Sequence, residues 1–272
     1  MARIALLQMT SGIDPEENFA AIRRAAHDAR AGGAEMLFTP EISLLLDRDR
    51  ERAGRHVVTQ EHSRYLPMLR ELAERLRLHI SLGSMAVALP DGRWANRSLL
   101  FFPNAEEPAR YDKMHMFDVD LASGESWRES NAYAPGDSVV AIDDTPVGRL
   151  GLTICYDLRF PALFEALGRR ACDAIAVPAA FTVPTGRAHW HILLRARAIE
   201  ASAYVIAAAQ VGAHRDGRRT YGHSLVVDPW GEVLLDMGGE EPGLAFAQID
   251  RDRIAEVRRQ LPSLANRRPV AT

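Results

Sequence analysis

The segment GLTICYDLRFP, residues 151–161, places a cysteine at the polar edge of an apolar run. Residues 151–154 are typical of the end of a buried strand, whereas Cys155 is followed by an acid, Asp157, and a base, Arg159. A cysteine that only fills a core fits better inside such a run. A thiol at a strand end can instead attack a carbonyl carbon, provided that a base and a cation lie nearby.

Two other strand-like segments end in residues that supply such a base and such a cation. Glu41 follows the apolar segment 35–39, and Lys113 follows the short segment 109–112. Reactive groups collect at the carboxyl ends of strands in sheets that helices cover. A thiol, a carboxylate and an ammonium group are the parts needed for acyl transfer from an amide. Glu41 would take the thiol proton and later activate water, and Lys113 would stabilise the oxyanion and favour the thiolate.

Each of the three residues also has an ordinary structural explanation. Cys155 could be a small packed hydrophobe, Glu41 a solvated loop acid and Lys113 a surface charge. Their spacing along the chain does not show that the three side chains meet.

Three segments that contain these residues resemble the signature segments of the nitrilase superfamily of carbon–nitrogen hydrolases. They are Pro40-Glu41, YDKMH at 111–115 and GLTICYDLRFP at 151–161, and they occur in the family's order of Glu, Lys and Cys. The similarity extends from Ile4 to about Arg268. The resemblance implies a cysteine-dependent amidase that cleaves non-peptide C–N bonds without a metal or an organic cofactor.

The same resemblance implies a role for each member of this Glu-Lys-Cys triad. Cys155 attacks the amide carbon, and Glu41 acts as general base and then protonates the leaving group. Lys113 and the backbone N–H of Tyr156 form the oxyanion hole. Water that Glu41 activates then hydrolyses the thioester.

Four further residues are expected to act around the substrate. Glu129, in RESNAYAPG, fills the place of a second glutamate that the family often has before a Pro-Gly pair, although a loop acid paired with a nearby base gives the same pattern. Arg159 would hold a substrate carboxylate bidentately, unless it forms a structural salt bridge with Asp157 or another acid. By similarity, Phe181 would line the pocket, unless it only packs in the core, and Thr185 would hydrogen-bond the acid end of the substrate.

Within the superfamily, the chain resembles the branch of deaminated glutathione amidases and ω-amidases. The segments that carry this likeness are KMHMFDVD, RESNAYAPG, LLRARAIEASAYVIAAAQ and YGHSLVVDPWG. The first activity is a metabolite repair that releases 2-oxoglutarate and cysteinylglycine, and the second releases ammonia from 2-oxoglutaramate. Both substrates have a 2-oxo acid head, so Arg159 does not separate them, but Ala209-Gln210 and the loop HRDGRRTYGHS favour the first. N-carbamyl amide hydrolysis and a catalytically idle, nitrilase-like binding protein remain alternatives.

Composition limits the partners and the setting. Of the 272 residues 47% are hydrophobic and 25% are charged, and the net charge of −3 predicts no attraction to nucleic acid or to anionic membranes. Two cysteines, Cys155 and Cys172, exclude a disulfide framework and indicate a reducing compartment. The apolar run in MARIALLQM is too short for a signal peptide, and no run of roughly 18 apolar residues occurs, so we expect a cytoplasmic protein with a small-molecule substrate.

Hydrophobic patterns alternate between strands and helices along the whole chain, which indicates mixed sheets covered by helices. No linker divides the sequence, so we expect one domain over residues 1–272. The resemblance implies an α/β fold, the four-layer α-β-β-α sandwich, and a homodimer or dimer-based oligomer. The expected helix 188–204 is a candidate for that interface through four apolar residues, Trp190, Leu193, Leu194 and Ile199, although a helix that packs only within its own subunit gives nearly the same pattern.

The nine histidines do not indicate a metal site by their spacing. His189 and His191 are two apart on an expected helix, so they do not share a face. His115 and His223 have no partner at the spacing of a metal ligand, and neither has Cys172.

Overall fold

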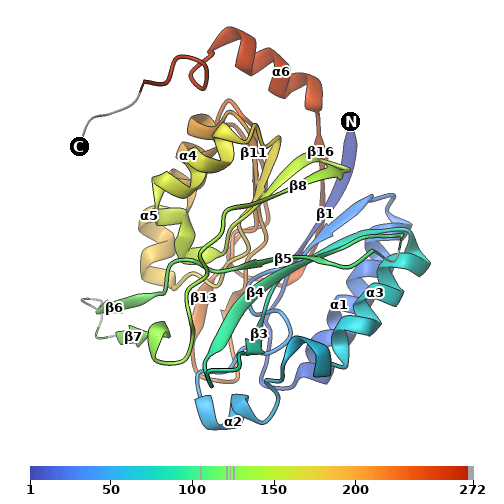
Figure 1. The fold of residues 1–272 in the computed structure, drawn as a ribbon, viewed down its shortest axis with the longest axis vertical. Helices are drawn as coiled ribbons and strands as arrows, with labels where there is room; N and C mark the ends of the chain where they lie inside the picture. Colours follow the sequence, from blue (N-terminus) through green and yellow to red (C-terminus); the bar gives the residue numbers. More distant parts are fainter. Residues whose placement is uncertain (105, 121, 123, 125, 269–272) are drawn as a thin grey trace.

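The computed structural model describes residues 1–104, 106–120, 122, 124 and 126–268, so the last four residues of the expected domain lie outside the described part. It confirms the expected four-layer sandwich of mixed sheets flanked by helices (Figure 1). Two six-stranded sheets pack face to face, in the orders β16-β1-β2-β3-β4-β5 and β15-β14-β11-β10-β9-β8. In Figure 1, α1 and α3 cover the first sheet on the right, and α4 and α5 cover the second on the left.

The first sheet has three parallel strands, β1 to β3, with antiparallel strands outside them. Its elements are β1 (Ala2–Gln8), β2 (Met36–Phe38), β3 (His79–Ala88), β4 (Trp94–Phe101), β5 (Ala109–Asp112) and β16 (Gly243–Ile249), with α1 (Pro15–Ala31) and α3 (Tyr65–Leu76) on its outer face.

The second sheet repeats this arrangement, with β9, β10 and β11 parallel and the outer strands antiparallel. Its elements are β8 (Val140–Thr145), β9 (Gly148–Leu152), β10 (Ala174–Ala176), β11 (Tyr204–Ala207), β14 (Leu225–Val227) and β15 (Val233–Asp236), with α4 (Pro161–Arg169) and α5 (Val183–Ala201) on its outer face. Smaller elements are α2 (Arg50–Gly54), β6 (Asp118–Asp120), β7 (Ser126–Arg128), β12 (Val211–Ala213), β13 (Arg219–Tyr221), α6 (Arg251–Gln260) and 3-10 turns at Gln60–His62, Glu129–Asn131 and Cys155–Arg159.

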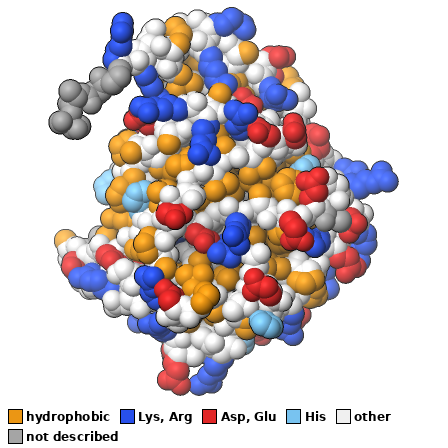
Figure 2. Space-filling view, viewed as in Figure 1, with side chains coloured by type: hydrophobic (Ala, Val, Ile, Leu, Met, Phe, Trp, Pro, Cys, Tyr) orange, Lys and Arg blue, Asp and Glu red, His pale blue; other side chains and the backbone are white. Residues whose placement is uncertain are grey.

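Strand β1 shows why both faces of a central strand are apolar. Successive side chains on a strand point to opposite faces. Ile4 and Leu6 therefore belong to the core between the two sheets, whereas Ala5 and Leu7 belong to the core beneath α1 and α3. The small net charge is also visible on the surface, because acidic and basic side chains are interspersed over the face in Figure 2.

Helix boundaries follow local signals. Helix α1 begins after Asp14, which accepts a 2.8 Å hydrogen bond from the N–H of Glu16, and Pro15 is its first residue. Helix α5 begins at Val183 and not at residue 188 as we expected, because Pro184 occupies its first turn. Thr185 therefore lies on the helix and not before it. In the described part of the chain no helix is long and apolar enough to cross a membrane.

The outer face of α5 differs from the expected one. Trp190 and Leu194 are fully buried in the core, so they do not contribute to an outer surface. Ile199, which was expected there, is 43% exposed, and Ile192, which was not, is 69% exposed. The two isoleucines are seven residues apart, so they lie on one side of the helix.

Candidate active site

Glu41, Lys113 and Cys155 lie together on the wall of one cavity of about 490 Å³. Each follows the carboxyl end of a strand: Glu41 follows β2, Lys113 follows β5 and Cys155 follows β9. Because the two sheets pack face to face, these strand ends from different sheets meet at one edge of the sandwich.

Gly83 in β3 allows this meeting. A Cβ atom at this position would lie 2.1 Å from the carbonyl oxygen of Thr39 and 2.6 Å from the Cβ of Pro178. Thr39 precedes Glu41 and Pro178 follows β10, so only a glycine lets the two strand ends come this close.

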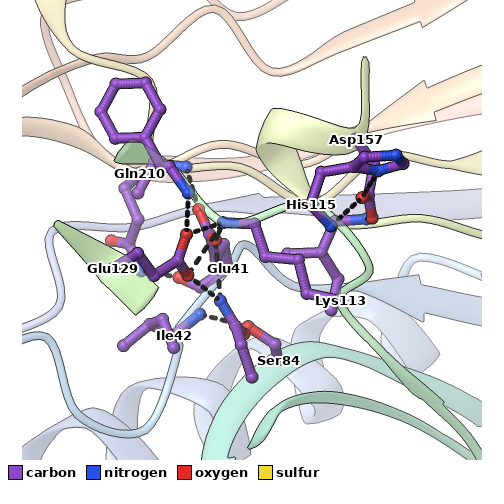
Figure 3. A network of polar contacts seen from close by, with 12 residues as sticks. Glu41, Ile42, Ser84, Lys113, His115, Glu129, Asp157 and Gln210 are labelled. Atoms are coloured by element: carbon purple, nitrogen blue, oxygen red, sulfur yellow. Dashed lines mark hydrogen bonds and ion pairs between the residues drawn. The ribbon is translucent and has the colours of Figure 1, made fainter. Parts of the chain in front are cut away.

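Lys113 is the centre of a buried charge cluster (Figure 3). Its Nζ lies 3.0 Å from Glu41 Oε1 and 3.0 and 2.8 Å from the two carboxylate oxygens of Glu129. Burial by itself lowers the pKa of the Lys113 ammonium group, but the carboxylates of Glu129 and Glu41 raise it well above its ordinary value. Lys113 is therefore a fixed positive charge at neutral pH.

Both carboxylates of the cluster have further donors. Asn96, on β4, donates from Nδ2 to Glu41 Oε1 at 3.0 Å and to Glu129 Oε1 at 3.2 Å. The backbone N–H of Ala180 donates to Glu41 Oε2 at 3.0 Å, and that of Phe117 donates to Glu129 Oε2 at 2.7 Å. The amide of Asn96 must present its nitrogen here, because its oxygen would face two carboxylates.

The main chain around Glu41 is anchored as well. Gln210 Nε2 donates to the backbone oxygen of Glu41 at 2.9 Å, and the backbone N–H of Ile42 donates to Ser84 Oγ at 2.8 Å (Figure 3). Ile42 has a positive φ of 53°, which a branched residue rarely adopts. The strained backbone is held by these bonds, and it directs the carboxylate of Glu41 toward Lys113.

Cys155 lies on a sharp turn between β9 and a 3-10 helix, Cys155–Arg159, and its φ is +48°. Asp157 holds this turn, because its Oδ2 accepts the N–H of Ile154 at 2.9 Å and the hydroxyl of Tyr111 at 2.7 Å. His115 contacts the other oxygen of Asp157 through its backbone N–H at 3.1 Å and its Nδ1 at 2.7 Å. The conformation of the cysteine is therefore set by the buried Asp157 carboxylate.

The surroundings of Cys155 favour the neutral form of its thiol. Burial raises its pKa well above the ordinary value, the negative charge of Glu41 raises it further, and Lys113 lowers it only in part.

The backbone N–H of Tyr156, the residue after Cys155, lies in the first turn of the 3-10 helix, where an N–H group has no acceptor within the helix. Within the described residues no other acceptor for this N–H is found.

Arg159 lines the same cavity, together with Phe181 and Thr185. Its guanidinium lies over the Phe181 ring at 5.3 Å, and its Nη1 is 3.1 Å from Nδ1 of His189. In the described part of the chain no carboxylate lies within 4.0 Å of Arg159, and Asp157, the acid named as its alternative partner, is bound to His115 and Tyr111 instead. The Thr185 hydroxyl is 2.8 Å from that of Thr182.

A second set of cavity residues lies on other segments, and it combines arginines with large aromatic rings. These residues are Arg48, Arg50, Arg128, Arg218, Arg219, Trp94, Trp127 and Tyr133. Arg218 is paired with Asp216 at 2.6 Å and lies over the ring of Trp127 at 5.1 Å. For the side chain of Arg219 the described residues contain no acidic partner within 4.0 Å.

Comparison with known proteins decides the family. A family model described as carbon-nitrogen hydrolase matches residues 3–259. The chain belongs to the carbon–nitrogen hydrolase family. This hydrolase is 42% identical to the deaminated glutathione amidase of Yersinia enterocolitica, over 278 residues that cover 100% of this chain and 94% of that protein. It is 38% identical to the human deaminated glutathione amidase, over 270 residues that cover 98% of this chain and 82% of that protein.

Comparison with solved structures supports the same family assignment. The NitFhit protein of C. elegans has a TM-score of 0.89 and 37% identity; the match covers 98% of this hydrolase and 66% of that longer chain. Nit3 of Saccharomyces cerevisiae, a member of branch 10 of the nitrilase superfamily, has a TM-score of 0.85 and 27% identity, over 96% of this chain and 94% of that one. The expectation of a nitrilase-type, cysteine-dependent carbon–nitrogen hydrolase is confirmed.

Two donors to Glu41 were not predicted from the sequence: the side chain of Asn96 and the backbone N–H of Ala180. Asn96 begins a run of three polar residues, Asn96-Arg97-Ser98, within a buried strand, and this was the available signal. A backbone donor leaves no signal in a residue type.

Proposed function

We propose that this hydrolase cleaves the amide bond of deaminated glutathione and releases 2-oxoglutarate and cysteinylglycine through a thioester on Cys155. The names of its similar relatives support this substrate. The observation that carries the chemistry is the Lys113 ammonium group, which is fixed beside the Cys155 thiol and the Glu41 carboxylate in one cavity.

In the first half of the reaction, Glu41 takes the proton from the Cys155 thiol while the sulfur forms a bond to the amide carbon. The carbonyl oxygen becomes negative, and Lys113 and the backbone N–H of Tyr156 stabilise it. When the tetrahedral intermediate collapses, the C–N bond breaks and Glu41 gives its proton to the departing amine of cysteinylglycine. A neutral thiol beside an anionic base is the starting state that this step needs, and the raised pKa of Cys155 supports it.

In the second half, Glu41 takes a proton from water, and the resulting hydroxide attacks the thioester carbon. The C–S bond breaks, the thiolate recovers the proton from Glu41, and 2-oxoglutarate leaves. The donors on Glu41, Asn96 Nδ2 and the Ala180 N–H, hold the carboxylate in place through both halves. Glu129 acts as a positioning residue, because its contacts are to Lys113, Asn96 and the backbone.

Recognition of the 2-oxo acid head is assigned to Arg159, with Phe181 and Thr185 beside it. A guanidinium without a carboxylate partner within the described residues is ready to accept one from a substrate. Phe181 packs against this guanidinium, so it limits the directions that Arg159 can take.

Recognition of the leaving group separates deaminated glutathione from 2-oxoglutaramate. Cysteinylglycine ends in a second carboxylate, whereas the leaving group of 2-oxoglutaramate is ammonia. We assign this second carboxylate to Arg219, with the Trp94, Trp127 and Tyr133 rings around the dipeptide. A cavity of about 490 Å³ is large for a five-carbon acid alone, which favours the longer substrate.

The test compares deaminated glutathione and 2-oxoglutaramate as substrates, with 2-oxoglutarate measured from both. Wild type should turn over the tripeptide analogue with the higher kcat/KM, and Cys155→Ala should turn over neither. Arg219→Ala should raise KM for deaminated glutathione about tenfold or more and leave KM for 2-oxoglutaramate unchanged. Arg159→Ala is the matched variant, and it should raise KM for both substrates.

The two assignments fail in different ways. A higher kcat/KM for 2-oxoglutaramate would make the protein an ω-amidase and contradict the proposed substrate. An equal effect of Arg219→Ala on both substrates would contradict the assignment of the dipeptide carboxylate alone.

The proposal extends to the oligomeric state of the protein and to the compartment in which it works. We infer that residues 1–272 act as one domain, that two copies pair through the outer face of α5, and that the protein works in a reducing compartment such as the cytoplasm. Ile192 and Ile199 are an exposed apolar pair on that helix, and Cys155 must stay a free thiol. Light scattering after gel filtration tests the pairing, and Ile192→Glu with Ile199→Glu should give a monomer.

A further inference from the structure

Outside the active-site cavity, three side chains from distant parts of the chain meet. His191 comes from α5, His223 from the turn before β14, and Asp236 from the end of β15. His191 Nε2 lies 3.0 Å from Asp236 Oδ2, and His223 Nδ1 lies 2.9 Å from Asp236 Oδ1. Ligand atoms of the three residues all lie within 4.8 Å of one another. Histidine side chains gather over α5 at the left edge of Figure 2.

We propose that His191, His223 and Asp236 bind one divalent transition-metal ion, with Zn²⁺ as the best match. Two imidazole nitrogens and one carboxylate oxygen form a donor set that suits Zn²⁺ and its neighbours in the first transition row. At metal–ligand distances of about 2.0–2.1 Å, tetrahedral ligand atoms are separated by about 3.3 Å. Asp236 Oδ2 alone lies 3.0 Å from His191 Nε2 and 3.1 Å from His223 Nδ1, which is close to this separation. The ligand atoms of the three residues lie within 4.8 Å of one another, so the two imidazoles need to approach each other to bind the same ion.

The side chains are held by further contacts. The N–H of Gly238 donates to Asp236 Oδ1 at 2.9 Å, and the N–H of His223 donates to the carbonyl of Gly238 at 2.7 Å. The Tyr221 ring stacks on His223 with centroids 4.4 Å apart and meets His191 edge-on at 6.1 Å. Such outer contacts orient the ligands of a metal site before the ion arrives.

The three side chains of the cluster are open to solvent. The three side chains are 33%, 23% and 33% exposed, for His191, His223 and Asp236 in turn. An ion can therefore enter from solvent and keep water at its remaining position.

The ion would have a structural role and would not take part in the proposed chemistry. None of its three ligands lines the active-site cavity. It would join α5 to the second sheet at a point next to the substrate pocket, because Trp190 donates from Nε1 to the carbonyl of His223 at 2.8 Å and packs on Phe181 with centroids 4.6 Å apart.

The test is a calorimetric titration of metal-free protein with Zn²⁺, in a Cys155→Ala background that removes the active-site thiol. One ion should bind per chain. His191→Ala and Asp236→Asn should each weaken binding at least tenfold, because each removes a ligand. His27→Ala, an exposed histidine on α1, is the matched control and should bind as tightly as its parent.

A second measurement does not depend on variants. Co²⁺, which is paramagnetic, should broaden the NMR signals of the His191 and His223 rings and leave those of His27 sharp. Absence of Zn²⁺ uptake, or uptake that His191→Ala and Asp236→Asn leave unchanged, would overturn the proposal.

Discussion

In the described part of the chain, two clusters of ionisable side chains have a similar design in different surroundings. In the active-site cavity, Lys113 lies between the carboxylates of Glu41 and Glu129. Beside α5, Asp236 lies between the imidazoles of His191 and His223. The Lys113 side chain is 2% exposed, whereas that of Asp236 is 33% exposed. The first cluster is closed around its central charge, and the second is open to water.

This difference decides what each cluster is able to do. A buried charge is stable only when its partners and their hydrogen bonds are complete, and the removal of one partner costs about 3–5 kcal/mol. An exposed ion pair contributes about 0–1 kcal/mol, so its members are free to change partners. The closed cluster can hold a catalytic base in one geometry, and the open cluster can admit an ion.

Lys113→Met should have the largest effect on both activity and stability. It removes the cation between two buried carboxylates, so we expect a loss of about 3–5 kcal/mol in the free energy of unfolding. Because Lys113 is the proposed oxyanion donor, we also expect kcat to fall by at least about 10²–10³. Urea unfolding and steady-state kinetics measure the two effects.

Cys155→Ala is the control for this variant, because it should abolish activity while changing the free energy of unfolding by no more than about 1 kcal/mol. If Lys113→Met unfolds no more readily than Cys155→Ala, the closed cluster does not depend on its cation.

Asn96→Ala should have the next largest effect. It removes the amide that donates to both Glu41 and Glu129, and hydrogen bonds to charged groups contribute about 1.5–3 kcal/mol. We expect a loss of this size in unfolding free energy and a lower kcat with little change in KM, because the proposed base loses one of its donors.

Ser98→Ala, on the same strand, is the matched control for Asn96→Ala. The Ser98 hydroxyl donates to the uncharged carbonyl of Leu82 at 3.1 Å, so its loss should cost only about 0.5–1.5 kcal/mol and leave kcat unchanged. Equal costs in the two variants would show that the charges of Glu41 and Glu129 do not strengthen the bonds of Asn96.

The two clusters also differ in how far the sequence predicts them. Glu41, Lys113 and Cys155 each end a strand-like segment within a recognisable motif, so local patterns indicate both the fold and these residues. Asn96 joins the site only because β4 packs beside β5, and no pattern in the sequence specifies that register. The start of α5 was placed too late because the apolar periodicity begins after Pro184, whereas the proline itself belongs to the first turn.

The open cluster could not be found from spacing at all. Its ligands lie at positions 191, 223 and 236, on a helix, a turn and a strand, and only the packing of α5 on the second sheet brings them together. Sequence motifs for metal sites rely on ligands that are a few positions apart. They do not detect a site whose ligands come together only through tertiary packing.

The pH dependence of stability tests the burial of a single imidazole, that of His214. Burial lowers the pKa of His214, which also contacts Ser11 O at 2.8 Å and Thr220 Oγ1 at 2.7 Å. The unfolded chain binds this proton at a pKa of about 6.5, so stability falls as the pH drops below that value, until the pKa of the folded state is reached.

Urea unfolding between pH 7.5 and 5.0 should show this loss, with a slope of at most about 1.4 kcal/mol per pH unit for one proton. His214→Asn should reduce the slope without removing it, because burial also lowers the pKa of His79. A slope that His214→Asn leaves unchanged would mean that this imidazole takes up its proton without cost in the fold.

Asp236→Asn in metal-free protein should have the smallest effect, and it tests the comparison most directly. The variant removes the central charge of the open cluster, as Lys113→Met removes that of the closed one. Because the side chains are solvated, we expect a change of less than about 1 kcal/mol in unfolding free energy, and an unchanged kcat/KM because Asp236 does not line the cavity. A loss of about 3 kcal/mol would mean that the two clusters contribute similarly to stability in spite of their different exposure. It would contradict the argument that the cluster beside α5 is free to accept an ion.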